Sequence, residues 1–370
     1  MSAQRIFLVA GEMSGDTHGA ELMASLEQLS ANEVTFAGLG GPKMAAWKLD
    51  DWIGDAAVVG LWEVLKKYGY FKRRFADAMA AIETFQPEVV VLIDYPGFNL
   101  RLAKALRKAG FTGKIAYYIS PQVWAWNKRR IPLMAQLLDL MLCIFPFEKA
   151  LYEDSGLKTE FCGHPLVDEL QVVIPEQRDN HLLGLFPGSR EREVNNLFPL
   201  MLDAAERLLG QNGGLQLEAA AANDRMAELM RSMATARGLE IPLTVGRAAS
   251  LMQRATVGVV ASGTATMEAA WFGLPYCLVY KVAWPTYVIG KTLVKIDFLG
   301  IVNILAEREV VKELIQHKAT GEAVAGELGP LLADAEARDL LSAELREVCA
   351  LLGGGGTHHR AAQALLRLVA

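Results

Sequence analysis

Short apolar runs alternate with amphipathic segments along almost the whole chain. In its first part, five runs rich in branched apolar side chains predict strands at residues 6–10, 34–39, 89–93, 115–119 and 140–145. Several of these runs are continuously apolar, which is typical of parallel strands covered on both faces. Between them, apolar residues at helical spacing predict helices, for example over residues 20–29 and 100–109. This alternation predicts a doubly wound α/β domain.

The same alternation resumes after a polar segment at residues 175–180. Further strands are predicted at residues 182–186, 215–219, 243–245, 257–261 and 277–280. The polar segment has the composition of a linker, so we expect two Rossmann-like domains, residues 1–170 and 171–352. Ligands of such sheets bind beyond the carboxyl ends of the strands. Two domains that face each other would therefore form a cleft lined by these loops.

Residues 353–370 differ from both domains. Four consecutive glycines, 353–356, have the flexibility of a hinge, and residues 358–369 carry an apolar stripe that predicts a final helix. The pattern leaves three arrangements open. The helix crosses back onto the first domain, packs on the second, or swaps onto a partner chain and forms a homodimer.

Composition narrows the function classes. The net charge of -5 argues against general nucleic-acid binding, which requires a basic face. The four cysteines are widely spaced and form no C-x-x-C pair, which favours a reduced, cytoplasmic protein. The chain enters a strand almost at once and has no apolar run of ~20 residues, so we expect neither a signal peptide nor a membrane span.

Two strand-to-helix turns in the second half are suited to phosphate. The predicted strand 182–186 leads into Gly188, Ser189 and Arg190, and the strand 257–261 leads into a second small-residue turn, formed by Ser262, Gly263 and Thr264. A helix N-terminus offers free N–H groups and a partial positive charge, and an arginine fork binds phosphate oxygens. Two such turns predict a nucleoside diphosphate site. Glu268, one turn into the second helix, either binds ribose hydroxyls or is a surface glutamate.

Asp94 directly follows the strand 89–93 and is a candidate general base for a hydroxyl nucleophile. The alternative is a turn or helix-cap role, which aspartate commonly takes. Asn99, which we place just before the next helix, is the better candidate for the cap. The loop after the first strand contains Ser14, Gly15 and Asp16, which either bind a sugar or hydroxyl group or cap the helix. No metal-ligand pattern is present, so we expect no metal and no other cofactor.

Residues 58–74 combine an apolar stripe with five cations, a pattern that can lie in a membrane interface. Core packing with a solvated basic rim is the alternative. The aromatic excess favours membrane docking through Leu61, Trp62, Val64, Leu65, Tyr68 and Phe71. Residues 124–130 repeat the combination of aromatic and basic side chains.

These motifs, taken in order, resemble the lipid A disaccharide synthase family of inverting, GT-B-type glycosyltransferases. The resemblance is carried by residues 9–16, 93–99, 120–126, 146–149, 163–165, 187–190, 262–268 and the segment around Asn303. It implies a UDP-2,3-diacylglucosamine donor, a 2,3-diacylglucosamine 1-phosphate acceptor and a peripheral site on the inner face of the cytoplasmic membrane. It also implies that Asp94 is the base, that Arg190 binds the diphosphate, and that Glu268 and Asn303 support nucleotide binding.

The chain departs from the family pattern at two positions. Met13 stands where the family has a small residue, and Glu307 replaces a glycine, which bears on the local backbone. Two other functions remain to be weighed. A UDP-sugar epimerase would share the two-domain architecture but would need further carboxylates around the donor sugar. A non-enzymatic nucleotide-sugar or lipid-binding module would bind without turnover.

Overall fold

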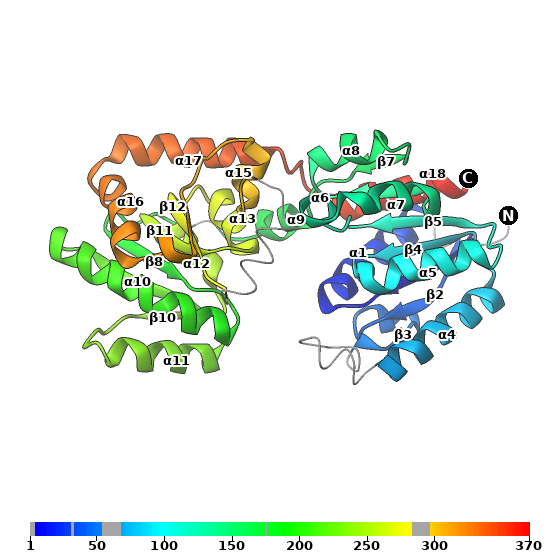
Figure 1. Ribbon diagram of the computed structural model, residues 1–370, viewed down its shortest axis with the longest axis horizontal. Coiled ribbons are helices and arrows are strands. Elements are labelled where there is room, and N and C mark those ends of the chain that lie inside the picture. The colour runs from blue at the N-terminus through cyan, green and yellow to red at the C-terminus, as the bar shows by residue number, and fades with distance from the viewer. Residues whose placement is uncertain (1–3, 31–32, 54–67, 175, 283–296) are drawn as a thin grey trace. The chain divides into compact units, whose positions relative to one another are not determined.

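The computed structural model describes residues 4–30, 33–53, 68–174, 176–282 and 297–370 (Figure 1). At residue 68 it describes the backbone only. The chain divides into two compact units. Unit 1 comprises Met1–Asp168 and Leu352–Ala370, and unit 2 comprises Glu169–Leu351. Each unit is an α/β domain with its own sheet.

Within the described residues, unit 1 contains a seven-stranded parallel sheet in the order β3-β2-β1-β4-β5-β6-β7. Its strands are β1 (Gln4–Ala10), β2 (Val34–Gly40), β3 (Asp50–Asp51), β4 (Val89–Ile93), β5 (Lys114–Tyr118), β6 (Leu140–Cys143) and β7 (Thr159–Phe161). Its helices are α1 (Met13–Leu29), η1 (Met44–Trp47), α4 (Tyr68–Phe85), α5 (Pro96–Lys108), α6 (Val123–Trp126), η2 (Lys128–Arg130), α7 (Ile131–Leu137), α8 (Pro146–Glu153), α9 (Pro165–Gln171), which runs into unit 2, and α18 (Thr357–Val369).

The sheet of unit 2 has six parallel strands among the described residues, in the order β10-β9-β8-β11-β12-β13. They are β8 (Leu182–Phe186), β9 (Gln216–Ala221), β10 (Leu243–Val245), β11 (Val257–Ala261), β12 (Tyr276–Tyr280) and β13 (Glu313–Ile315). The helices are α10 (Glu191–Gln211), α11 (Asp224–Thr235), α12 (Ala248–Arg254), α13 (Thr264–Trp271), α15 (Ile301–Ala306), η3 (Gln316–Lys318), α16 (Gly321–Ala333) and α17 (Ala335–Ala350).

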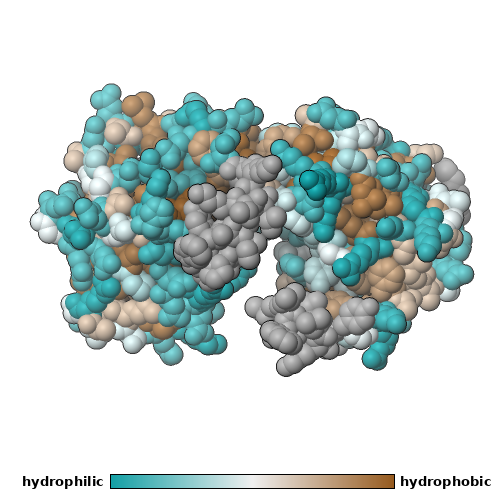
Figure 2. All heavy atoms as spheres, viewed as in Figure 1, coloured by the Kyte–Doolittle hydropathy of each residue, from teal (hydrophilic) through white to brown (hydrophobic). Residues whose placement is uncertain are grey.

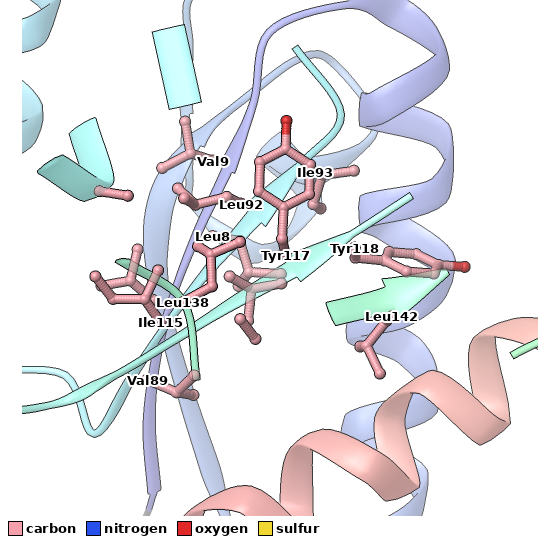
Figure 3. Packing of buried hydrophobic residues seen from close by; sticks show 14 of the residues in the cluster. Leu8, Val9, Val89, Leu92, Ile93, Ile115, Tyr117, Tyr118, Leu138 and Leu142 are labelled. Carbon is pink, nitrogen blue, oxygen red and sulfur yellow. The ribbon is translucent and has the colours of Figure 1, made fainter. Parts of the chain in front are cut away.

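The core of unit 1 lies on the central strands. Leu8, Leu92 and Tyr117, on three adjacent strands, are all fully buried and pack together (Figure 3). Each such side chain contributes about 1.5–3 kcal/mol through burial. Both faces of the sheet are covered, which explains why the strands were recognisable as continuous apolar runs. Figure 2 shows hydrophilic side chains over much of the visible face of each unit.

Helix α18 packs against α1 and β5 and so belongs to unit 1 of its own chain. The Asp168 carboxylate accepts hydrogen bonds from the N–H groups of Gly356 and Thr357, which caps the start of α18. The glycine run before it is held by Arg360, whose guanidinium donates to the carbonyls of Gly354 and Gly355 and of Cys162.

The predicted strands all exist, and four of them have the predicted bounds. The sequence missed β3, β7 and β13, which have two or three residues each and leave no measurable pattern. It also placed the starts of α1 and α5 too late, because their first turns are polar or glycine-rich. In the part of the chain that the structure describes, no helix combines the length and apolarity that crossing a bilayer requires.

Candidate active site

Asp94 occupies a strained turn at the carboxyl end of β4. Asp94 and Tyr95 both have left-handed backbones, with φ of 44° and 48°, which non-glycine residues adopt at a cost of about 1–3 kcal/mol. Asn99 stabilises the turn because its Nδ2 donates to the carbonyls of Ile93 and Asp94, at 3.1 and 2.7 Å. The phenol of Tyr117 also donates to the Asp94 carbonyl. These contacts fix the backbone of Asp94 and do not involve its carboxylate.

The predicted capping role of Asn99 was wrong. Helix α5 begins at Pro96, so Asn99 lies inside the helix rather than before it. The residue that precedes the helix is Tyr95, and no side chain caps the helix there. Asn99 instead ties the end of β4 to the first turn of α5.

Burial and a neighbouring negative charge both raise the pKa of Asp94. The pKa rises from its ordinary 3.8 to about 6, chiefly through burial and secondly through the charge of Glu12. Glu12 follows β1, which is paired with β4 so that Ala10 lies opposite Ile93. A Cβ on Gly11 would lie 2.2 Å from the Tyr95 ring, so glycine is required for this close packing of the two loops. The interaction between Glu12 and Asp94 was not predictable from the sequence pattern.

The loop after β1 divides into exposed and buried parts. Ser14 is exposed, Met13 is 57% exposed and Gly15 is buried. Asp16 is fully buried, and its carboxylate accepts from the N–H groups of Gly41, Lys43 and Met44 at 2.8–2.9 Å. Its hydrogen bonds shape the loop after β2, and neither Ser14 nor Asp16 caps α1. Of the three residues proposed for substrate binding in this loop, Ser14 is the one whose side chain faces solvent.

In unit 2 the structure brings seven of the predicted residues around one cavity of about 640 Å³. Its lining includes residues from both phosphate-type turns and from the helix that follows the second, namely Gly188, Ser189, Arg190, Ser262, Gly263, Thr264 and Glu268. The turns meet because β8 and β11 are paired, with Phe186 opposite Val260. The carboxyl ends of neighbouring parallel strands thus form one site, as expected for this fold class.

The two turns differ in what they offer an anion. At the first, Glu193 Oε2 accepts from the N–H groups of Ser189 and Arg190, so the expectation of free N–H groups there was wrong. The other oxygen of Glu193 pairs with the Arg190 guanidinium at 2.9 Å, although the Arg190 side chain is 82% exposed. At the second turn, α13 begins after Gly263 and has no side-chain cap. The uncapped N-terminus of α13 and the exposed guanidinium of Arg190 are therefore the features of the cavity that are chemically suited to an anion.

Glu268 and Arg247 complete the polar lining of the cavity. Burial, and then the charge of Glu169, raise the pKa of Glu268. Sequence reasoning missed Arg247, although it follows the short strand β10 at the same edge of the sheet. A search for cations within two residues after every predicted strand would have found it.

Asn303 does not line this cavity. It is fully buried, its Nδ2 donates to the Val311 carbonyl and to Glu313, and its Oδ1 accepts from the N–H groups of Val310 and Val311. All of these contacts shape the segment that leads into β13. Glu307 ends α15 in a left-handed conformation with φ of 55°, the geometry for which the family glycine is suited.

The predicted docking segment is described only in part. Leu61, Trp62, Val64 and Leu65 lie outside the described residues, as does the side chain of Tyr68. Phe71 is half-buried and packs edge-on against Trp52 with 6.3 Å between ring centroids. It packs against the core of unit 1 and is only partly exposed. In the second aromatic and basic segment, Trp124 is buried and Trp126 is 43% exposed.

Comparison with known proteins connects this geometry to a family. The sequence model of the lipid-A-disaccharide synthetase family matches residues 6–364. The lipid-A-disaccharide synthase of Trichlorobacter lovleyi is 38% identical and covers 99% of this chain and 98% of its own length. That of Geobacter metallireducens is 37% identical, with 99% and 97% covered.

Solved structures show the fold. The UDP-GlcNAc 2-epimerase from Neisseria meningitidis bound to UDP-GlcNAc has a TM-score of 0.61 at 11% identity, covering 98% of this chain and 100% of that chain. The calicheamicin glycosyltransferase CalG4 has a TM-score of 0.57 at 14% identity, covering 99% and 98%. The fold is of the GT-B type, and it is common to epimerases and transferases. The full-length sequence relatives make the distinction: the chain belongs to the lipid-A-disaccharide synthase family and is a glycosyltransferase of lipid A biosynthesis.

Proposed function

We propose that the protein transfers 2,3-diacylglucosamine from its UDP derivative to the 6-hydroxyl of 2,3-diacylglucosamine 1-phosphate. The acceptor O6 bonds to the anomeric carbon of the donor, and the bond from that carbon to the UDP oxygen breaks. Inversion at this carbon gives a β-1,6-linked disaccharide 1-phosphate, and UDP leaves with the electron pair. Asp94 takes the proton of the hydroxyl.

The state of Asp94 is the observation that carries this proposal. Its carboxylate caps no helix, its backbone is fixed by Asn99, and its pKa of about 6 leaves it ionised but basic at neutral pH. A general base works best when its pKa lies near the operating pH. Glu12 supports this role by its negative charge, and Ser14, on the neighbouring loop, is available to hold an acceptor hydroxyl.

The donor is proposed to bind in the cavity of unit 2. Arg190 exchanges its partner Glu193 for the diphosphate and stabilises the charge that develops on departing UDP. The N-terminus of α13 binds the same group, and Glu268 accepts from ribose hydroxyls. Asn303 acts indirectly, because its contacts fix the backbone between α15 and β13.

Both substrates carry acyl chains, so we place the enzyme at the inner face of the cytoplasmic membrane. Support comes from an aromatic–basic surface formed by Trp126, Lys128, Arg129, Arg130 and Leu133. Trp126 and Leu133 are 43% and 39% exposed, and the Arg130 guanidinium lies 4.9 Å from the Trp126 ring centroid. Among the described residues, none of its three cations has an acidic partner. Exposed cations and an amphipathic indole suit an anionic bilayer.

The surface also lies on the appropriate edge of the sheet. It follows β5, whose carboxyl end is paired with that of β4, so that Ile93 lies opposite Tyr118. A lipid acceptor taken up at this surface would enter unit 1 on the edge that carries Asp94.

The test is the reaction itself. Purified protein is incubated with both acylated substrates in detergent micelles, with UDP release measured by a coupled assay and the product by mass spectrometry. We expect UDP release that requires the acceptor. Conversion of the donor sugar without acceptor would indicate an epimerase, and donor binding without turnover would indicate a binding module; either result would overturn the proposal.

A further inference from the structure

The segment after β5, residues 119–127, is held in a strained conformation beside the strand that carries Asp94. Ile119 has φ of 63°, a left-handed backbone that is strongly unfavourable for a β-branched residue. Its N–H donates to the Leu142 carbonyl at 3.1 Å, which keeps the turn in place. Such strain persists when the surrounding structure enforces it, and it gathers at functional sites. The contacts that enforce it therefore bear on function.

Glu148, on α8, makes the central contact. Its side chain is fully buried, and Oε1 accepts from the indole N–H of Trp124 at 2.9 Å. Its other oxygen accepts from the backbone N–H of Phe145 at 3.2 Å. Ser120 and the backbone of Ile144 also contribute hydrogen bonding, all of these donors are neutral, and no cation forms an ion pair with Glu148 among the described residues. A buried carboxylate without a cation is costly, so its retention calls for a reason beyond stability.

The surroundings of Glu148 form a rigid support. The Trp124 ring packs edge-on against Phe147 with 4.9 Å between centroids, and the Tyr152 phenol donates to the Pro121 carbonyl at 3.2 Å. The segment is thus attached to α8 at both Pro121 and Trp124. Between and beyond these points, Gln122 and Trp126 remain exposed on the edge of the sheet that carries Asp94.

We propose that Glu148 is a positioning residue for the acceptor. By holding Trp124, its carboxylate fixes residues 119–127 in the shape in which Gln122 and Trp126 contact the acylated sugar phosphate. The inference rests on the proposed function, in which unit 1 binds the acceptor beside Asp94. Glu148 itself does not touch the substrate.

Protonation weakens this anchor. Burial raises the pKa of Glu148 from 4.5 to about 7, although its hydrogen bonds act in the opposite direction. The titratable groups that face it are the thiol of Cys143 on β6 and the phenol of Tyr152 on α8. Burial raises the pKa of both, so they stay neutral while Glu148 titrates. Acceptor binding should therefore weaken as pH falls through about 7.

The test compares three variants by steady-state kinetics with both substrates. Trp124→Phe keeps the ring and removes the N–H, and Glu148→Gln keeps the shape and removes the charge. Glu153→Gln, at an exposed position on the same helix, is the matched control. We expect the acceptor KM to rise about tenfold in the first two, as for loss of a hydrogen bond to a charged group. In these two variants kcat and the UDP affinity should stay within about twofold of wild type. All three quantities should stay within about twofold of wild type in the control Glu153→Gln.

A spectroscopic measurement separates positioning from general destabilisation. In protein labelled with 5-fluorotryptophan, the ¹⁹F resonance of Trp124, assigned through Trp124→Phe, should titrate with a midpoint near pH 7 and lose that titration in Glu148→Gln. Unchanged acceptor KM in both variants, or equal losses of acceptor and UDP binding, would overturn the inference. Lack of acceptor-dependent turnover by the wild type would instead contradict the proposed function.

Discussion

The pKa of Asp94, the proposed general base, is set by the residues around it. Its pKa of about 6 predicts that kcat/KM rises with pH through a midpoint near 6 and then levels off, because the ionised carboxylate is the active form. Glu12→Gln should move this midpoint to lower pH, since a negative charge that opposes ionisation is removed. The measurement is a pH–rate profile, with Glu33→Gln as control, an exposed carboxylate that precedes β2 at the opposite edge of the sheet. If the midpoint of the pH–rate profile is the same in Glu12→Gln as in wild type, burial alone raises the pKa of Asp94.

The same feature makes Asp94 costly for stability. Its folded pKa lies above its ordinary 3.8, so its contribution to stability is complete below pH 3.8 and is lost as pH rises through 6. We predict that Asp94→Asn raises the free energy of unfolding by about 3 kcal/mol at pH 7.5 and by nearly nothing below pH 4. Denaturant unfolding at both pH values would measure this, and equal changes at both would contradict it.

Sequence reasoning located site residues where position along the chain was enough. Asp94 and Arg190 each follow an apolar strand, and strand ends of a parallel sheet gather at one edge. The partners of these residues were not predictable in the same way. The pairing of Arg190 with Glu193 depends on the geometry of a helix turn. The hydrogen bonds of Asp16 and Asn303 depend on the folded shape of the loops after β2 and α15. In each case the same residue type can either bind a ligand or form hydrogen bonds within the fold, so the sequence alone does not distinguish the two roles.

At the scale of elements, α18 depends on one carboxylate at its start. Asp168→Ala leaves the N–H groups of Gly356 and Thr357 without their acceptor, and loss of such a cap costs about 1 kcal/mol. We predict faster amide hydrogen exchange in α18 and in α1, against which it packs. Asp334→Ala is the matched control, because Asp334 caps α17 in unit 2. Its effect should be confined to α17; faster exchange throughout the chain in Asp168→Ala would show a global rather than a local effect.

The aromatic–basic surface gives a second prediction at this scale. Trp126→Ser together with Leu133→Ser should remove the apolar anchor, and replacement of Lys128 and Arg129 by Gln should remove about 1 kcal/mol of attraction per cation. We expect reduced co-sedimentation with vesicles that contain anionic lipid, while UDP affinity is unchanged. Lys318→Gln and Lys312→Gln in unit 2 provide the charge-matched control. If co-sedimentation is not reduced, another part of the chain must bind the membrane.

Long buried elements were predictable and short ones were not. A strand such as β4 is apolar throughout because both of its faces are covered, and its bounds follow from the sequence alone. Strand β3 consists of two aspartates and exists because its neighbour β2 offers an unpaired edge. Helix α1 begins earlier than predicted. Its first turn escaped prediction because Ser14 and Asp16 interrupt the apolar spacing there.

At the scale of the whole molecule, each unit has its own sheet and core. A ligand that binds one unit should therefore stabilise that unit alone, by about 2.7 kcal/mol at a hundred times its Kd. We predict that UDP raises the temperature of one calorimetric transition and leaves a second one unmoved.

Arg190→Ala should greatly reduce the shift caused by UDP, whereas Asp94→Asn should retain it. Equal upward shifts of all transitions would mean that the two units unfold together. A shift that persists in Arg190→Ala would remove this residue from the diphosphate site.

The contact between α1 and α18 has a consequence for how the protein is made. A ribosome synthesises α18 after all of unit 2, so unit 2 can fold while the apolar face of α1 still lacks its cover. A chain whose translation stops early would carry a finished unit 2 and a unit 1 in which the apolar face of α1 is uncovered, and chaperones and proteases recognise exposed apolar surface. Packing of α18 on α1 thus distinguishes full-length molecules from truncated ones.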